Sequence, residues 1–183
     1  MKLEILEKDY LYHIYNRGIN SENIFLSDEN KTYFLKLLSK YLSAKIDVYA
    51  YCLMDNHFHI VLKIIEEERI VTQSFSNFFN AYAKAFNKQN QRTGSLFEKH
   101  FKRIKIQDDN YLRSIIQYVH LNPKHHLNTN YKTYKHSSFQ AMISVSQTKL
   151  ARCEVLSYFD GIDNFIYCHD FKNEVLSEKF IFE

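Results

Sequence analysis

The sequence predicts an α+β fold in one compact unit, on the basis of three observations. The chain has 183 residues, 45% of them hydrophobic, which is enough to bury a core. Its 3 glycines and 1 proline leave little material for a flexible linker. Runs of β-forming residues alternate along the chain with segments whose apolar residues recur at helical spacing.

The first half of the chain predicts a strand, a helix and a hairpin. Residues 10–16 are rich in β-forming side chains and stop at Arg17-Gly18, which favours a turn. Ser27 is a candidate N-cap, and the apolar residues that follow it to Leu42 have helical spacing. Residues 46–54 and 58–65 are two β-type runs joined by Asp55-Asn56, so we expect a hairpin.

The second half predicts a helix over 66–91, a strand over 96–106 and a helix from Asp108 to Leu121, closed by Asn122-Pro123. The order is therefore βαββαβ, the ferredoxin-like arrangement. It implies a four-stranded antiparallel sheet with two helices on one face and the other face available for a site. Residues 1–140 would form this domain, and 141–183 a helical extension packed on it, with helices over 146–158 and 170–182.

The net charge of +3 conceals an uneven distribution. Residues 84–136 hold 11 basic and 3 acidic residues, whereas residues 153–183 have a net charge of −5. The basic middle is a candidate anion-binding surface, and a solvated charged face is the alternative. Within it, Lys99 to Lys105 interleaves cations with apolar residues at strand-like period. One face of such a strand can be buried while the other presents charge to phosphates.

The cysteines and the apolar runs indicate a soluble protein of the reducing cytoplasm. Cys52, Cys153 and Cys168 form no CxxC pair, so neither a zinc site nor a disulfide framework is predicted. No uncharged apolar run approaches the roughly 20 residues that a membrane span needs. We therefore expect no membrane association.

Asp55-Asn56-His57-Phe58-His59 places two histidines two residues apart on a predicted strand. Alternation sends both imidazoles to one face and Phe58 into the core. Two neutral imidazoles on one face can chelate a divalent metal. With nine histidines, about 0.4 such pairs are expected by chance, so the motif gains its weight from opening a central strand.

A second candidate pair is Tyr118 and Asn122, one turn apart on the predicted helix that begins at Asp108. They sit at the edge of its apolar stripe, from which they can reach an adjoining cleft. The alternative is that Tyr118 is an amphipathic residue at the margin of the core. Spacing does not single this pair out, because Tyr12 and Asn16 share it.

Four motifs stand in order along the chain: residues 12–18 (YHIYNRG), 49–60 (YAYCLMDNHFHI), 92–97 (RTGSLF) and 118–123 (YVHLNP). Together they resemble the single-tyrosine HUH transposase family, especially its REP-associated tyrosine transposase branch. The resemblance runs from about residue 10 to residue 140. After Pro123 the chain departs from that branch, since Lys124-His-His stands where a Val-Arg-Ala-Gly-like stretch is usual.

The resemblance implies that His57, His59 and Asn122 bind Mg²⁺ or Mn²⁺ and that Tyr118 attacks a DNA phosphodiester. The attack would form a 5′-phosphotyrosine and free a 3′-OH, so a strand could be cut and rejoined without ATP. A phenol, with a pKa of about 10, is a poor nucleophile unless charge on the phosphate is neutralised. A divalent metal supplies that neutralisation.

The implied substrate is single-stranded DNA that carries imperfect hairpins. Seven residues are candidates for contact with it, with solvated surface charge as the alternative for each: Asn16, Arg17, Arg92, Lys99, Lys102, Arg103 and Lys105. In the IS200-like insertion-sequence members of this family the tyrosine helix works across a homodimer, whereas in the REP-associated branch it can act within a monomer. The sequence leaves both arrangements open.

Two other functions compete with a transposase that cuts DNA. One is a domesticated or inactive module that binds hairpin DNA on the same fold; an intact set of His57, His59, Tyr118 and Asn122 argues against it. The other is a metal hydrolase of small molecules, for which Asp55 is the sole carboxylate next to the histidines.

Overall fold

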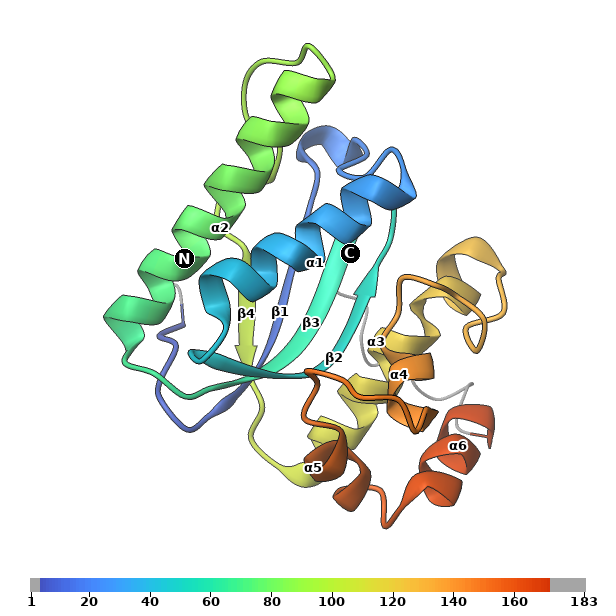
Figure 1. The fold of residues 1–183 in the computed structure, drawn as a ribbon. Helices are drawn as coiled ribbons and strands as arrows, with labels where there is room; N and C mark the ends of the chain where they lie inside the picture. The colour runs from blue at the N-terminus through green and yellow to red at the C-terminus, as the bar shows by residue number, and fades with distance from the viewer. Residues whose placement is uncertain (1–3, 172–183) are drawn as a thin grey trace.

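A computed structural model describes residues 4–171 and has a four-stranded sheet with helices on both faces (Figure 1). In chain order the elements are β1 (Leu11–Arg17), η1 (Ile19–Ser21), α1 (Asp28–Leu42), β2 (Ile46–Leu53), β3 (His57–Ile64), α2 (Glu68–Gln89), β4 (Lys102–Lys105), α3 (Asp109–Leu127), α4 (Phe139–Ile143), α5 (Arg152–Ser157) and α6 (Ile162–Phe171).

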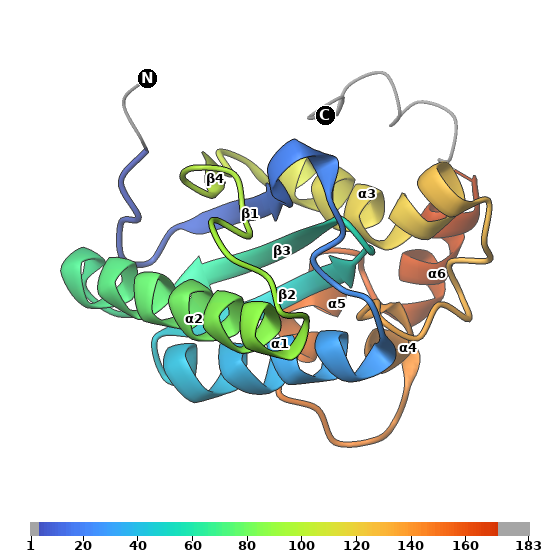
Figure 2. The ribbon, with the colours of Figure 1, turned by 90° about the horizontal axis from the view of Figure 1, so that it is seen from above.

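The sheet has the order β2-β3-β1-β4, and every neighbouring pair is antiparallel. Together with the element order, this topology confirms the predicted ferredoxin-like βαββαβ fold. Helices α1 and α2 lie side by side on one face, while α3 lies on the opposite face (Figure 2). The second face, predicted to be available for a site, is covered in part by α3, which contacts both β2 and β3.

An aromatic cluster fills the core between the sheet and the helices α1 and α2. Phe34 of α1 is fully buried, and its ring centroid lies between 4.8 and 5.2 Å from those of Phe25, Phe58, Phe78 and Tyr82. Phe58 belongs to β3, so the cluster joins both helices to the strand that carries the two histidines.

The turn after β1 requires a glycine. A Cβ atom at Gly18 would lie 1.9 Å from the carbonyl oxygen of Glu22, which no other residue can accommodate. The Gly18 amide also donates to the carbonyl of Asn56 at 2.8 Å, which ties the end of β1 to the β2–β3 turn. This close packing fixes Arg17 beside the start of β3.

The N-caps of α1 and α3 lie where the sequence predicts them, but the C-terminal end of α3 does not. Ser27 caps α1 and Asp108 caps α3, each by accepting a backbone N–H three residues later. The predicted end at Asn122-Pro123 is wrong, because α3 continues to Leu127 and stops at Asn128, which has a left-handed φ of 49°. Pro123 removes one helical hydrogen bond, and burial of this segment in the core offsets that loss.

The strand predicted over residues 96–106 is shorter in the structure, since β4 pairs with β1 only from Lys102 to Lys105. Upstream, Phe97 makes an isolated bridge and His100 adopts a φ of 59°, which turns the chain out of the sheet. Phe97 and Phe101 are both buried, and their ring centroids lie 5.4 and 5.2 Å from that of Phe79 on α2. Packing against α2 thus replaces strand pairing here.

The segment predicted as a helix over 146–158 is helical only in α5. Its first part is irregular because Arg152 donates to the carbonyls of Ser144 and Ser146, while the Ala151 amide bonds to β2. The sequence did not predict α4 and α6. The helix predicted over 170–182 lies outside the described residues except at its first two positions, which end α6.

A second core lies beneath α3 and is completed by the short C-terminal helices. Among its fully or nearly fully buried rings, Phe139, Phe159 and Phe165 pack against the apolar side of α3. The three cysteines are free. Within residues 4–171, no helix has the length and apolar character that crossing a membrane requires.

Candidate active site

Two imidazoles open β3 on the face that α3 covers. The ring centroids of His57 and His59 are 5.1 Å apart, with the ring planes at 82°. Phe58, between them, is fully buried in the opposite core, so the predicted alternation is confirmed. On the neighbouring strand, Arg17 pairs with His57 and Tyr15 with His59.

Helix α3 brings Tyr118 and Asn122 to the same place. The Tyr118 ring meets the His59 ring edge-on at a centroid distance of 5.5 Å. Oδ1 of Asn122 lies 3.3 Å from Nε2 of His57, and Nδ2 of Asn122 donates to the Tyr118 carbonyl at 2.9 Å. That backbone contact, one turn back along α3, fixes the amide so that its oxygen faces the histidine. All four residues meet within a single chain.

His57 is held between two amide oxygens. Its Nδ1 lies 2.7 Å from Oδ1 of Asn56, and its Nε2 faces Oδ1 of Asn122. An amide oxygen only accepts, whereas a neutral imidazole carries a single N–H. A neutral His57 that donates to Asn56 therefore turns a lone pair toward the oxygen of Asn122. A second proton on the ring, or a cation bound between these two atoms, resolves that conflict.

Of these two alternatives, the surroundings of His59 favour a bound cation over a second proton. Its Nδ1 lies 2.9 Å from Nε2 of His13, and its own Nε2 is buried with no hydrogen-bond partner among residues 4–171. Burial, and then the neighbouring histidines, hold the pKa of His59 well below its ordinary value. Burial likewise lowers the pKa of His13 to about 3. Neutral imidazole is the form that binds metals, so a buried lone pair at Nε2 fits a metal ligand.

The donor set consists of two imidazole nitrogens and one amide oxygen. Among the described residues, no group of three or more His, Cys, Asp or Glu side chains is placed to hold a metal ion. A set of three candidate ligands would therefore include the Asn122 oxygen. All three candidates are neutral, which would leave the charge of a bound cation available to an anion.

The site opens into a cavity of about 230 Å³ at the ends of β1 and β3. The histidines line it together with Tyr15, Asn16, Arg17, Glu98 and Lys102. Nε of Arg17 lies 2.6 Å from Oε1 of Glu98, and both side chains are partly exposed. Lys102 lies opposite Tyr15 across the β1–β4 pair. The cavity thus joins two cations and one carboxylate to the two histidines, whereas Tyr118 and Asn122 are not among its lining residues.

The seven predicted DNA contacts fall into three groups. Asn16, Arg17 and Lys102 line the site cavity. Lys99 and Arg103 lie beyond it and line an adjacent groove. The remaining two are engaged in ion pairs elsewhere: Arg92 with Glu22, and Lys105 with Glu7.

The adjacent groove has a volume of about 600 Å³ and lies between α2 and the segment from Gly94 to Arg103. Its α2 wall carries polar side chains roughly one turn apart, beside the apolar Phe79 and Ala83: Thr72, Ser76, Asn80 and Lys84. Asn16 and Glu98 line both this groove and the site cavity. The two hollows are therefore neighbours across these side chains.

The sequence did not single out three residues of the site: His13, Tyr15 and Glu98. Alternation along β1 places His13 and Tyr15 on the same face as Arg17, so a period-two count could have found them. The Tyr15 ring stacks on both His13 and His59, with centroids 4.9 and 5.6 Å away. Glu98 gave no comparable signal, since the chain leaves the sheet at that point.

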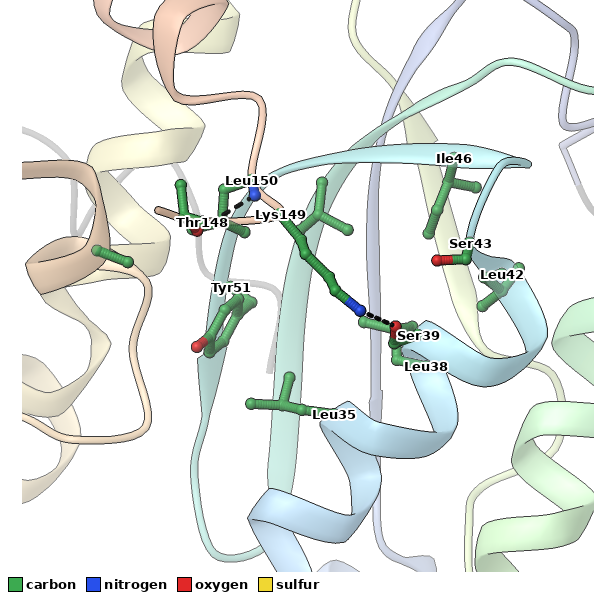
Figure 3. A pocket seen from close by; sticks show the side chains of 12 residues that line it. Leu35, Leu38, Ser39, Leu42, Ser43, Ile46, Tyr51, Thr148, Lys149 and Leu150 are labelled. Carbon is green, nitrogen blue, oxygen red and sulfur yellow. Dashed lines mark hydrogen bonds between the residues drawn. The ribbon is translucent and has the colours of Figure 1, made fainter. Parts of the chain in front are cut away.

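An apolar pocket of about 250 Å³ lies away from this site, between the C-terminal half of α1, β2 and residues 148–150 (Figure 3). Lys149 extends across it, and its Nζ donates to the Ser39 hydroxyl at 3.1 Å. The pocket shares no residue with the histidine site and presents no cluster of reactive groups.

Comparison with known proteins matches the fold but not the sequence. No family model matches the chain, and no curated protein is significantly similar to it. Among solved structures, a REP-associated tyrosine transposase bound to a REP hairpin aligns with a TM-score of 0.62 and 15% identity, over 78% of this chain and 84% of that one. A candidate transposase from Deinococcus radiodurans R1 aligns with a TM-score of 0.44 and 16% identity, over 65% of this chain and 95% of that one. The first alignment shows that this chain shares the fold of the REP-associated transposase.

Proposed function

We propose that this chain is a transposase-type endonuclease that cuts and rejoins hairpin-bearing single-stranded DNA through one tyrosine and a divalent metal. The observation that carries the proposal is the meeting of Tyr118, His57, His59 and Asn122 in one chain, with Oδ1 of Asn122 beside Nε2 of His57 and the Tyr118 ring against that of His59. The fold shared with a REP-associated transposase supports the same function. So do the four sequence motifs that resemble that branch.

His57, His59 and Asn122 would hold the metal, Mg²⁺ or Mn²⁺. Two imidazoles favour Mn²⁺ in affinity, whereas the cellular abundance of Mg²⁺ favours the lighter ion. When bound, such a cation polarises a phosphoryl oxygen and stabilises the charge that develops during transfer. The amide of Asn122 is already oriented for this role by the Tyr118 carbonyl.

Tyr118 would be the nucleophile. Its phenolic oxygen forms a bond to phosphorus while the bond from phosphorus to the 3′ oxygen breaks, leaving a 5′-phosphotyrosine. The phenolic proton is lost and the departing 3′ oxygen gains one, so water is not consumed. A later 3′-OH reverses the exchange and restores Tyr118. The edge-on contact with His59 keeps the phenol next to the ligand set.

Arg17 and Lys102 would orient the phosphate, since both line the cavity into which the histidines open. Glu98 holds Arg17 in the free protein. A phosphate that pairs with Arg17 competes with this carboxylate. The exposed ion pair is weak enough to be displaced, typically about 0.2–1 kcal/mol.

The neighbouring groove would take the single strand next to the cleaved phosphate. Its amide and hydroxyl side chains offer donors and acceptors for base edges, and Lys84, Lys99 and Arg103 offer positive charge. Because the groove and the site cavity share Asn16 and Glu98, one strand can pass from one to the other.

The proposed chemistry is tested by incubating the protein with hairpin-bearing single-stranded DNA and Mn²⁺ or Mg²⁺. We expect a covalent protein–DNA adduct on a denaturing gel. Tyr118→Phe should abolish the adduct and leave DNA binding intact. Tyr111→Phe, on the same helix but outside the ligand set, is the matched control and should still form it. An adduct that survives Tyr118→Phe would exclude this tyrosine, and binding without cleavage in any divalent metal would favour an inactive hairpin-binding module.

The proposed DNA path is tested by a pair of lysines on α2. Both Lys84 and Lys88 are exposed, but only Lys84 lines the groove. Lys84→Ala should weaken binding of single-stranded DNA and lower the slope of log affinity against log salt by about 0.7. Lys88→Ala removes the same charge one turn away and should change neither. Equal effects of the two substitutions would mean that net charge, not the groove, governs binding.

A further inference from the structure

A third histidine lies directly behind the candidate metal ligands. His13, on β1, is fully buried, and its Nε2 lies 2.9 Å from Nδ1 of His59. The two rings are almost parallel, with centroids 5.1 Å apart and planes at 16°. His13 pairs with Val61 in the β1–β3 register, so its contact with His59 is diagonal across the sheet.

One hydrogen lies between these two nitrogens, and its position decides what His59 can do. If His59 donates from Nδ1, its Nε2 holds a lone pair. If His13 donates instead, Nε2 of His59 carries the hydrogen, as a buried N–H with no acceptor among the described residues. An N–H at this position excludes a cation, whereas a lone pair binds one.

We propose that His13 is a positioning residue that accepts the Nδ1 hydrogen of His59 and thereby presents Nε2 of His59 to the divalent metal. This inference rests on the proposed function, because it assigns a task relative to that metal. Ligand histidines in proteins donate their second ring N–H to an outer acceptor, which fixes tautomer and ring orientation. In this chain the outer acceptor is a neutral imidazole.

An imidazole acceptor differs from a carboxylate in charge. A carboxylate behind His59 would add a negative charge next to the ion, and so would weaken its attraction for a phosphate. His13 fixes the ring without that charge. Tyr15 stacks on both rings and holds their planes, so β1 supports the ligand from behind while Arg17, two residues on, faces the cavity.

The inference is tested on the full chain by measuring Mn²⁺ affinity with titration calorimetry. His13→Phe keeps an aromatic ring but removes the acceptor, and should weaken Mn²⁺ binding by about 10- to 100-fold. His13→Gln keeps an acceptor oxygen and should stay within a few-fold of the wild type. His57→Ala, which removes a proposed ligand, should abolish specific binding.

The imidazole tautomers give a second readout, which is spectroscopic and needs no metal. Long-range ¹H–¹⁵N spectra of the metal-free wild type should show His59 protonated at Nδ1 and bare at Nε2, and His13→Phe should release this preference. If folded wild-type protein binds no Mn²⁺, both the proposed function and this inference fail. If it binds Mn²⁺ and His13→Phe binds equally well, or His59 carries its hydrogen on Nε2, only the inference fails. Equal losses in His13→Phe and His13→Gln would also overturn it, because packing alone would then explain them.

Discussion

Replacing His169 by glutamine should make the stability of this protein less dependent on pH. His169 of α6 is fully buried, and its Nδ1 donates to the Phe165 carbonyl at 2.7 Å. Its Nε2 lies 2.9 Å from Nδ1 of His120, whose Nε2 lies 2.8 Å from the Ser138 hydroxyl. Because a carbonyl only accepts, the hydrogens are fixed in one direction: Ser138 donates to His120, and His120 donates to His169. A second proton on His169 would sit on Nε2 and would point at the N–H of His120.

The size of the effect follows from the pKa of His169. Burial lowers this pKa to about 4, from about 6.5 in an unfolded chain. The folded state therefore prefers the neutral ring, and its contribution to stability is complete above pH 6.5 and lost as the pH falls toward 4. At pH 5 the loss from this one group is about 2 kcal/mol. Burial also holds the pKa of His120 well below its ordinary value, which acts in the same direction.

The assay is urea unfolding followed by circular dichroism at pH 7.5 and pH 5.0, for the wild type and His169→Gln. Glutamine can donate to Phe165 and accept from His120 but does not titrate, so it retains the hydrogen bonds without the proton uptake. Between the two pH values, the wild type should lose about 2 kcal/mol more than the variant. His100→Gln, which changes an exposed histidine, should lose as much as the wild type.

The reasoning would be refuted by equal losses in the wild type and in His169→Gln. That result would mean that His169 is already protonated in the folded protein at pH 5, or that acid destabilisation arises entirely from other groups. The compared quantity is the change in the free energy of unfolding between pH 7.5 and pH 5.0. A packing defect of the variant does not affect this change, because it lowers the stability by the same amount at both pH values.

Three further predictions follow from packing and from the site. Phe34→Ala should reduce the free energy of unfolding by about 3–5 kcal/mol in urea, since it empties the centre of the aromatic cluster; a loss under 1 kcal/mol would contradict that placement. A mixture of His57→Ala and Tyr118→Phe proteins should form no DNA adduct, because each chain builds its own site; restored adduct would instead reveal a shared site in a dimer. Glu98→Gln frees Arg17 and should tighten binding of single-stranded DNA about 2- to 5-fold at low salt, by fluorescence anisotropy, whereas unchanged affinity would rule out this competition.

Most of the fold could be predicted because its elements carry local signals. The β2–β3 hairpin, the N-caps of α1 and α3 and the long helix α2 all have apolar periods or capping residues that need no tertiary information. The errors arise where packing overrides such signals. Pro123 lacks a backbone N–H and so predicts a helix end, yet α3 continues past it to Leu127 because this turn is buried. The segment before β4 has a strand-like composition, but its phenylalanines pack against α2.

The site was predictable in part, for the same reason. Alternation places His57 and His59 together, and one helical turn separates Tyr118 from Asn122, so each pair follows from its own element. That the two pairs meet depends on how α3 crosses β3, which no local pattern encodes. The contact between His13 and His59 depends on strand register and is invisible until β1 and β3 are paired.

The candidate ligand set of the site carries no charge, and this bears on the chemistry it can support. The three candidate ligands are neutral, and the group behind His59 is neutral as well. Glu98 is the one carboxylate from residues 4–171 that lines the cavity, and it is paired with Arg17. A cation held by such a set keeps its full charge, and therefore binds the protein less tightly than at a carboxylate site but attracts an anion more strongly. Under the proposed function, such a cation would be held by the protein alone and would draw the phosphate of bound DNA toward Tyr118.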